Sequence, residues 1–195
     1  MIMKKIYVLL ATALVLFASC SKDSGTVTSE SIFPNYSDVV IPVNIAPLNF
    51  MVSGAEKVKV NISGTSEYSF SNRGETVKFP LKRWKQMLNV EKGNSLKVSV
   101  FVNGENSPLA QFNWTVSADS IDKYLSYRLI EPAYEVWSRI EIQERNLENF
   151  STRLLGDNRT ADKCCINCHT TNNKGTSFMH LRGSNGGTIL NRNGV

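Results

Sequence analysis

The sequence predicts a mainly β protein with a helical segment: an immunoglobulin-like antiparallel β-sandwich, then a helix, then an irregular tail. Two observations indicate the sandwich. Short segments with alternating apolar and polar residues recur along the first part of the chain, and glycine and asparagine turns separate them. Such alternation buries one face of a strand and leaves the other in water. We therefore expect a sandwich domain over residues 37–118, which is long enough for one hydrophobic core.

The expected strands follow in order along this domain. The first covers residues 39–43, where Pro42 and the nearby Pro47 predict an edge strand or a bend. Later strands are expected at residues 57–62, 67–71, 75–79, 96–102 and 110–116. The last two are predicted to form a hairpin, because Asn103-Gly104 between them predicts a turn.

One helix is expected inside the sandwich domain. Pro80 suits the first position of a helix, and Gly93 is a residue at which helices stop. Between them, Leu81, Trp84 and Leu88 fall on one helical face. The helix is therefore predicted to pack this face on the sandwich core.

Residues 119–156 are predicted to form a strand followed by a second helix. The strand is expected at 124–130, before Pro132. An imperfect helical stripe of apolar residues then follows: Tyr134, Trp137, Ile140, Leu147, Phe150 and Leu154. The tail, residues 157–195, is polar and rich in asparagine, glycine and threonine, so we expect it to stay irregular unless a bound group supplies apolar surface.

The N-terminus has the form of a signal peptide, predicted over residues 1–19. Lys4 and Lys5 precede an apolar run that is too short to span a bilayer comfortably. The small residues directly before Cys20 resemble the lipobox of bacterial lipoproteins, and this resemblance implies cleavage before Cys20 and lipidation of its thiol. Residues 20–36 would then be a polar tether, and we expect an outer-membrane anchor with the protein on the periplasmic face or the cell surface.

The charge of the chain is mild. The full sequence has 22 basic and 17 acidic residues, a net charge of +5. Removal of Lys4 and Lys5 with the signal peptide leaves 20 basic against 17 acidic residues, a net charge of +3. We therefore expect no nucleic-acid partner. The expected partners are the membrane, through the lipid anchor, and a redox partner protein of unknown identity.

Residues 165–169 form a C-x-x-C-H motif, the spacing that attaches haem covalently. Two thiols one short turn apart can reach the two vinyl groups of one porphyrin, and the histidine that follows can ligate the iron. We predict haem c attached at Cys165 and Cys168, with His169 as the proximal iron ligand.

The sixth iron ligand is predicted to be His180, about ten residues beyond the motif and one of only two histidines in the chain. Met179 beside it is the alternative, and an open sixth position or a more distant ligand also remains possible at this stage. A methionine ligand raises the reduction potential of haem, whereas a second histidine lowers it.

The same cysteines allow two other interpretations. Cys164 has no role in the haem motif. A zinc site could therefore form from Cys164, Cys165, Cys168 and a histidine. Structural zinc usually takes two separated ligand pairs, which this arrangement lacks. A redox disulfide would need the motif to open a helix after a buried strand, and no such strand is expected before it.

Several segments together resemble a family of bacterial lipoproteins labelled TolB-like β-propeller or cytochrome c biosynthesis proteins. They are residues 44–50, 127–132, 143–150, 165–169 and 180–183. The resemblance implies haem binding at Cys165, Cys168 and His169, and leaves the activity poorly defined. Members of the family continue into a β-propeller after the glycine-rich segment. This sequence ends at Val195, where the first blade is expected, which indicates either a short homologue or a truncated product.

Two classes of function are compatible with these features. The first is electron transfer by a lipid-anchored mono-haem cytochrome, in which the sandwich is a spacer. The second is a cell-surface interaction module in which zinc or a disulfide makes the cysteine site purely structural. No P-loop, dinucleotide fingerprint, H-E-x-x-H or G-x-S-x-G motif is present, so the sequence favours an electron carrier over an enzyme while leaving enzyme activity open.

Overall fold

The computed structural model describes residues 29–130, 139–161, 163, 165–166, 168–172, 174–184 and 186–192. The predicted signal peptide, Cys20 and its lipid, most of the tether, Cys164, and the proposed helical residues Tyr134 and Trp137 lie outside these residues. In the part that is described, no helix is long and apolar enough to cross a membrane.

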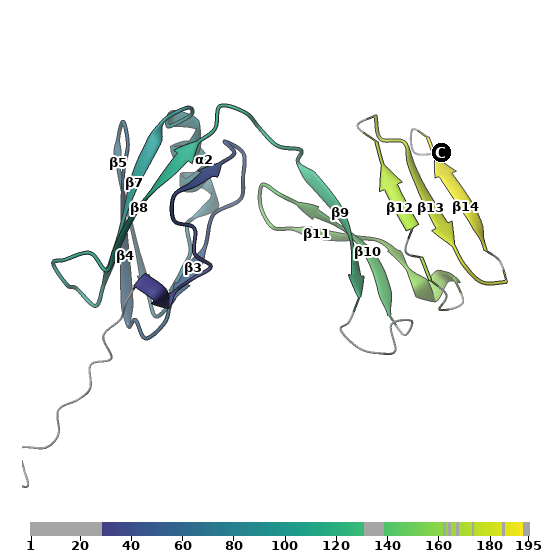
Figure 1. The fold of residues 1–195 in the computed structure, drawn as a ribbon, viewed down its shortest axis with the longest axis horizontal. Coiled ribbons are helices and arrows are strands. Elements are labelled where there is room, and N and C mark those ends of the chain that lie inside the picture. Colours follow the sequence, from purple (N-terminus) through teal and green to yellow (C-terminus); the bar gives the residue numbers. More distant parts are fainter. Residues whose placement is uncertain are drawn as a thin grey trace, which may run out of the picture.

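The prediction of a mainly β, sandwich-like fold is confirmed (Figure 1). After a short 3₁₀ turn, η1 (Ser29–Ser31), the first unit of the chain contains two sheets. A five-stranded sheet has the order β2-β8-β7-β4-β5, and a three-stranded sheet has the order β1-β3-β6. Their bounds are β1 (Ile32–Phe33), β2 (Val39–Ile41), β3 (Phe50–Val52), β4 (Lys57–Ser63), β5 (Glu67–Arg73), β6 (Thr76–Val77), β7 (Ser95–Val102) and β8 (Ala110–Val116).

The core of this unit forms where the alternating strands turn their apolar residues inward. In β4 and β7 every second residue is buried, as the sequence pattern predicts. The predicted β7–β8 hairpin is present, and β2 pairs with β8 at the edge of the sheet, where Pro42 ends it. The two large aromatic side chains Trp84 and Trp114 meet edge to face in the centre, with ring centroids 5.6 Å apart.

The helix predicted after Pro80 is also present, as α2 (Leu81–Val90). It turns Trp84, Met87 and Leu88 into the core. The indole N–H of Trp84 donates to the carbonyl of Ile45 at 2.9 Å, so the largest buried side chain also keeps its polar group bonded.

Residue Glu91, directly after α2, is a fully buried carboxylate. It accepts hydrogen bonds from the backbone N–H groups of Thr65 and Ser66, from the Thr65 hydroxyl and from the Tyr68 hydroxyl, at 2.8–3.1 Å. Burial works to raise the pKa of Glu91, but these donors hold it below its ordinary value. Gly64 lies against it: a Cβ there would sit 2.6 Å from a carboxylate oxygen. The carboxylate thus holds the β4–β5 turn against the end of α2.

A second unit follows, and it corrects the prediction for residues 119–156. The expected strand is present as β9 (Tyr124–Ile130), but the predicted helix is wrong over residues 140–157. β10 (Ile140–Asn146) and β11 (Thr152–Asp157) form a hairpin there, in a sheet of order β11-β10-β9. Asparagine explains the turn between them, because the Asn146 and Asn149 side chains accept backbone N–H groups two residues ahead at 2.9 and 3.0 Å.

The tail is not irregular, which is a further correction. After the turn η2 (Asn158–Ala161) it forms an antiparallel sheet of β12 (Cys168–Thr171), β13 (Ser177–Leu181) and β14 (Gly187–Asn191). The β12–β13 turn is closed by Asn172, whose side-chain oxygen accepts the N–H groups of Lys174 and Thr176, and by Gly175 at φ +76°. Local turn chemistry therefore orders a segment whose composition alone predicts disorder.

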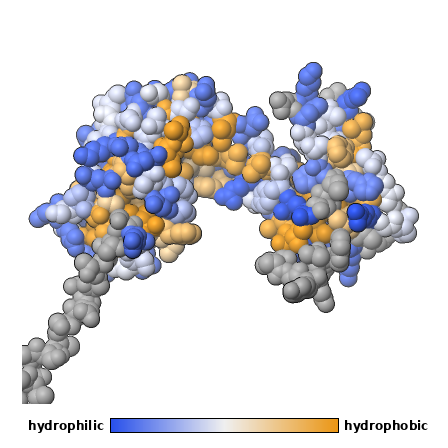
Figure 2. All heavy atoms as spheres, viewed as in Figure 1, coloured by the Kyte–Doolittle hydropathy of each residue, from blue (hydrophilic) through white to orange (hydrophobic). Residues whose placement is uncertain are grey.

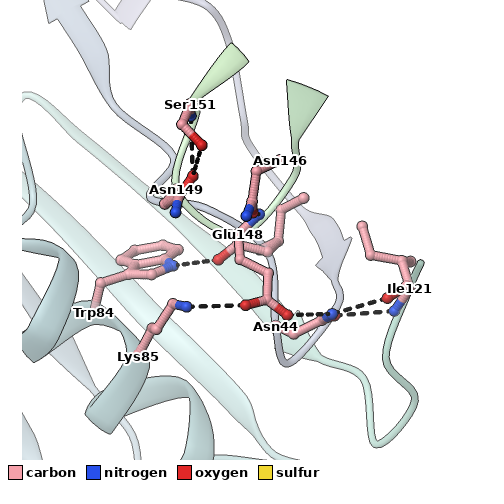
Figure 3. Close-up of polar contacts among 9 residues, drawn as sticks. Asn44, Trp84, Lys85, Ile121, Asn146, Glu148, Asn149 and Ser151 are labelled. Atoms are coloured by element: carbon pink, nitrogen blue, oxygen red, sulfur yellow. Dashed lines mark hydrogen bonds and ion pairs between the residues drawn. The ribbon is translucent and has the colours of Figure 1, made fainter. Parts of the chain in front are cut away.

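The sandwich and the second unit are joined by a polar contact made by Asn44, Lys85 and Glu148 (Figure 3). Lys85 on α2 donates to Glu148 at 3.1 Å, and this bond holds the pKa of Glu148 below its ordinary value. The Asn44 amide donates to Glu148 at 3.3 Å and to the carbonyl of Ile121 at 2.9 Å. The β10–β11 turn is thereby seated on the sandwich, which positions the rest of the second unit.

Candidate functional site

The predicted site residues lie in the second unit, where the β9–β11 sheet faces the β12–β14 sheet (Figure 1). A small buried cluster joins the two sheets. It contains Ile140 and Ile142 of β10 with Cys165 and Ile166 of the motif segment, and Met179 and Leu181 of β13 pack against it from their partly buried positions. The motif is therefore attached to the middle sheet by apolar contacts rather than standing free in solvent.

Cys165 is 9% exposed and is a free thiol in the apolar cluster. Its carbonyl oxygen accepts the N–H of Arg182 at 3.1 Å, which ties the motif to the end of β13. A thioether to haem needs a thiol at the edge of the porphyrin, so the segment at Cys165 would have to turn outward to make one. The backbone of Cys168 lies in β12.

A buried polar group supports the segment that leads into the motif. Asn158 is fully buried, and its side chain accepts the N–H of Ile140 at 3.1 Å and donates to the carbonyl of Lys163 at 3.4 Å. The N–H of Lys163, a residue at φ +57°, returns a hydrogen bond to the Asn158 carbonyl at 2.9 Å. These bonds hold the 158–163 turn at the start of β10.

Two buried carboxylates flank this turn. Hydrogen bonds from Arg139 and Gln143, at 2.8 and 2.6 Å, lower the pKa of Glu141. Arg159 donates to Asp157 through its side chain and its backbone N–H, and lowers the pKa of that carboxyl in turn. Both carboxylates are therefore ionised and satisfied, which is the arrangement of a structural support rather than of a proton donor.

The two histidines lie on neighbouring strands but face opposite ways. In the β12–β13 register His169 is opposite Met179, and Cys168 is opposite His180. Residues opposite one another share a face and consecutive residues alternate, so His169 shares its face with Met179, and His180 points to the other face. A ring nitrogen of His180 lies 3.0 Å from the hydroxyl oxygen of Thr188 on β14. The structure thus brings His169 together with Met179 and not with His180.

His169 and Met179 line one groove between the two sheets, with a volume of about 470 Å³. Its walls are mixed. Apolar side chains of β10, β11, β13 and β14 meet an ion pair at 2.9 Å between Glu144 and Arg153. The groove is lined by Ser126, Ile142, Glu144, Arg153, Leu155, Gly156, His169, Thr171, Gly175, Ser177, Phe178, Met179, Ile189 and Asn191. This volume lies within the range of small-molecule sites.

The fit to a haem is therefore uneven. His169, half-buried on the wall of the groove, would suit an iron ligand, and Arg153 at the same groove would suit a carboxylate. Met179 stands beside His169 on the same face of the β12–β13 pair rather than across the groove from it. Among the described residues no three His, Cys, Asp or Glu side chains gather as a metal site.

Sequence reasoning missed the groove and the polar contact to the sandwich. Nothing in the spacing of Glu144, Arg153 or Leu155 distinguishes them from ordinary strand residues. Two of the segments that carry the family resemblance, 44–50 and 143–150, do meet in the structure: Asn44 bonds Glu148, and the N–H of Ala46 donates to the carbonyl of Leu147 at 2.8 Å. Their shared richness in asparagine was the available signal.

Hydrophobic residues are also exposed along the β9–β11 sheet (Figure 2). Tyr124, Leu125, Leu129, Leu154 and Leu155 are each between 45% and 51% exposed.

Comparisons with protein-family models, with curated protein sequences and with solved structures find no match for this chain.

Proposed function

We propose that this chain is a membrane-anchored, mono-haem c-type cytochrome-like lipoprotein that transfers electrons. Haem c would be attached at Cys165 and Cys168, with His169 as the proximal ligand, and lipid would be attached at Cys20. The anchor would hold the protein at the outer membrane, on the periplasmic face or the cell surface. The observation that carries the proposal is the C-x-x-C-H motif whose histidine lines a groove with both apolar and polar walls.

In this proposal the residues that line the groove have separate roles. Haem, when bound, would supply a one-electron couple at its iron. His169 would ligate the iron, and the apolar side chains of Ile142, Leu155 and Ile189 would shield the bound group from water. Arg153 would leave its ion pair with Glu144 and pair with a haem propionate instead. His180, the predicted sixth ligand, would share the face of His169 only if β13 changed its register, and Met179 is the alternative ligand that already shares that face.

The proposal is tested by detecting haem that is covalently attached to the chain. The chain would be produced with a c-type cytochrome maturation system, separated on a denaturing gel and stained for haem peroxidase activity. Cys165→Ser and Cys168→Ser should each weaken or abolish the stained band, because each removes a thioether, and Cys164→Ser is the matched control that should keep it. A protein band without stain in the parent chain would refute the proposal.

A second candidate function is an interaction module with a structural cysteine site, and the burial of Cys165 favours it. In this case Cys165 acts as a small apolar residue of the cluster. Cys165→Ala would then leave the fold and any partner binding intact, and the purified protein would carry no haem. The absorption spectrum of pyridine-treated protein separates the two candidates, because only covalent haem gives the c-type bands.

A further inference from the structure

The outer face of the five-stranded sheet carries cations that oppose one another. Lys57 on β4 lies directly opposite Arg73 on β5, and both side chains are exposed. Lys59 follows on the same face, about 7 Å further along β4. Like charges directly across a sheet destabilise it. Among the described residues none of these three cations forms an ion pair with a carboxylate, so the fold itself does not explain their position.

An aromatic ring stands beside these cations. Phe101 on β7 is directly opposite Lys59 and is half-buried on the outer face. It is the only aromatic residue among the outward-facing residues of β4, β5, β7 and β8. Lys57, Lys59, Asn61, Phe101 and the 104–106 turn line a hollow of about 370 Å³, with Glu105 as its one carboxylate.

The face also carries Glu67 on β5 and Lys97 on β7, and its remaining strand residues are mostly hydroxyl and amide groups. The Ser69 hydroxyl donates to Asn61 at 2.9 Å, and the Gln111 amide donates to Ser99 at 3.0 Å. Each amide keeps further donors and acceptors for a ligand. The strands thus present rows of uncharged hydrogen-bonding groups next to the cations and the ring.

We propose that this face binds an anionic polysaccharide, a polymer whose carboxylate or sulfate groups alternate with hydroxyls. Lys57, Lys59 and Arg73 would meet the anionic groups, Phe101 would stack on the face of a sugar ring, and the amides of Asn61 and Gln111 would bond hydroxyls. The proposal concerns the sandwich and is independent of haem in the second unit.

The cations fit any polyanion, and the side chains beside them decide which polyanion fits this face best. A membrane surface would be met by several apolar side chains that insert beside the cations, whereas the outward-facing strand residues next to Lys57 and Lys59 are polar apart from the half-buried Phe101. Single-stranded nucleic acid stacks successive bases on several rings, and this face has one.

The experiment uses the full chain without its predicted leader and Cys20, with soluble heparin as the probe in titration calorimetry at 50 and 150 mM salt. Lys57→Ser combined with Arg73→Ser should weaken binding by about tenfold at 50 mM, because two charge-assisted contacts are lost. Lys82→Ser with Lys92→Ser removes the same charge from exposed positions in and after α2, which packs on the other side of this sheet, and should change binding less than twofold. Equal weakening by the two double variants would overturn the proposal.

A second series of variants distinguishes recognition of sugar rings from attraction to negative charge. Phe101→Ser should weaken heparin binding and leave binding of polyglutamate, a polyanion without rings, unchanged, while Phe101→Tyr should retain heparin binding. If polyglutamate, phosphatidylglycerol vesicles or oligothymidine bind as tightly as heparin and respond equally to the Lys57/Arg73 variant, the face is a general anion surface and the proposal fails. Thermal unfolding of each variant checks that the sandwich is intact.

Discussion

The sandwich and the second unit differ in how much apolar surface each one buries. The first has a continuous core from both sheets and α2, centred on Trp84 and Trp114. The second has a small cluster of Ile140, Ile142, Cys165 and Ile166 and leaves several leucines half in water. Stability increases with the apolar area that a unit removes from water. The sandwich therefore carries most of the stability, and the second unit is where a ligand or a partner has the most to add.

The largest effect should come from the sandwich core. Trp84→Ala removes one of the two fully buried tryptophan side chains and leaves its bond partner, the carbonyl of Ile45, without a donor. We expect a loss of about 3–5 kcal/mol in the free energy of unfolding. Urea denaturation followed by circular dichroism measures it. Lys82→Ala on the exposed side of α2 is the control, and a Trp84→Ala protein as stable as this control would contradict the central role of the core.

Truncating a buried side chain in the second unit should destabilise that unit and leave the sandwich folded. Ile166→Ala removes an almost fully buried side chain from the small cluster and should cost about 2–3 kcal/mol, at the low end for such changes, because the site can partly collapse. Limited proteolysis should then cut within residues 120–192 and leave the sandwich resistant. Cleavage inside the sandwich at the same rate would show that the two units unfold together.

The buried carboxylate after α2 should make the sandwich sensitive to acid. Glu91→Ala leaves the N–H groups of Thr65 and Ser66 without their acceptor and should cost about 1–3 kcal/mol. Because the pKa of Glu91 is lower in the folded state, its contribution is fully present above the unfolded value, about 4.3, and is lost as the pH falls through the folded value. Chemical denaturation at pH 7 and pH 3 should show the gap between parent and variant closing at low pH.

The smallest effect should come from the contact that joins the two units. Glu148→Gln removes the ion pair with Lys85, in which both side chains are partly exposed, so the free energy of unfolding should fall by less than about 1 kcal/mol. The main effect should be that the two units move more freely relative to each other, while the free energy of unfolding changes little. Small-angle scattering should report a larger radius of gyration than for Glu144→Gln, which breaks a comparable ion pair within the second unit. Equal radii would show that backbone contacts such as Ala46 to Leu147 suffice.

The sequence predicted the sandwich well and the second unit poorly, for one physical reason. In β4, β7 and β8 the apolar residues other than Phe101 and Ala110 face a thick core, so the alternation in the sequence records burial directly. In the second unit the core is thin, and apolar residues such as Phe150 and Leu154 remain exposed. Their spacing resembled a helical stripe although the asparagines of the β10–β11 turn favour a hairpin.

Local patterns in the sequence were enough to predict α2, the β7–β8 hairpin, the C-x-x-C-H motif and the sandwich strands other than the short β1 and β3. Tertiary structure alone decided which candidate ligands meet. The turn at Asn172 and Gly175 sets the β12–β13 register, and this register pairs His169 with Met179. Side chains alternate along a strand, so a slip of one residue would reverse the outcome and place His180 on the face of His169. Such a register depends on pairing between strands, which no spacing along the chain records.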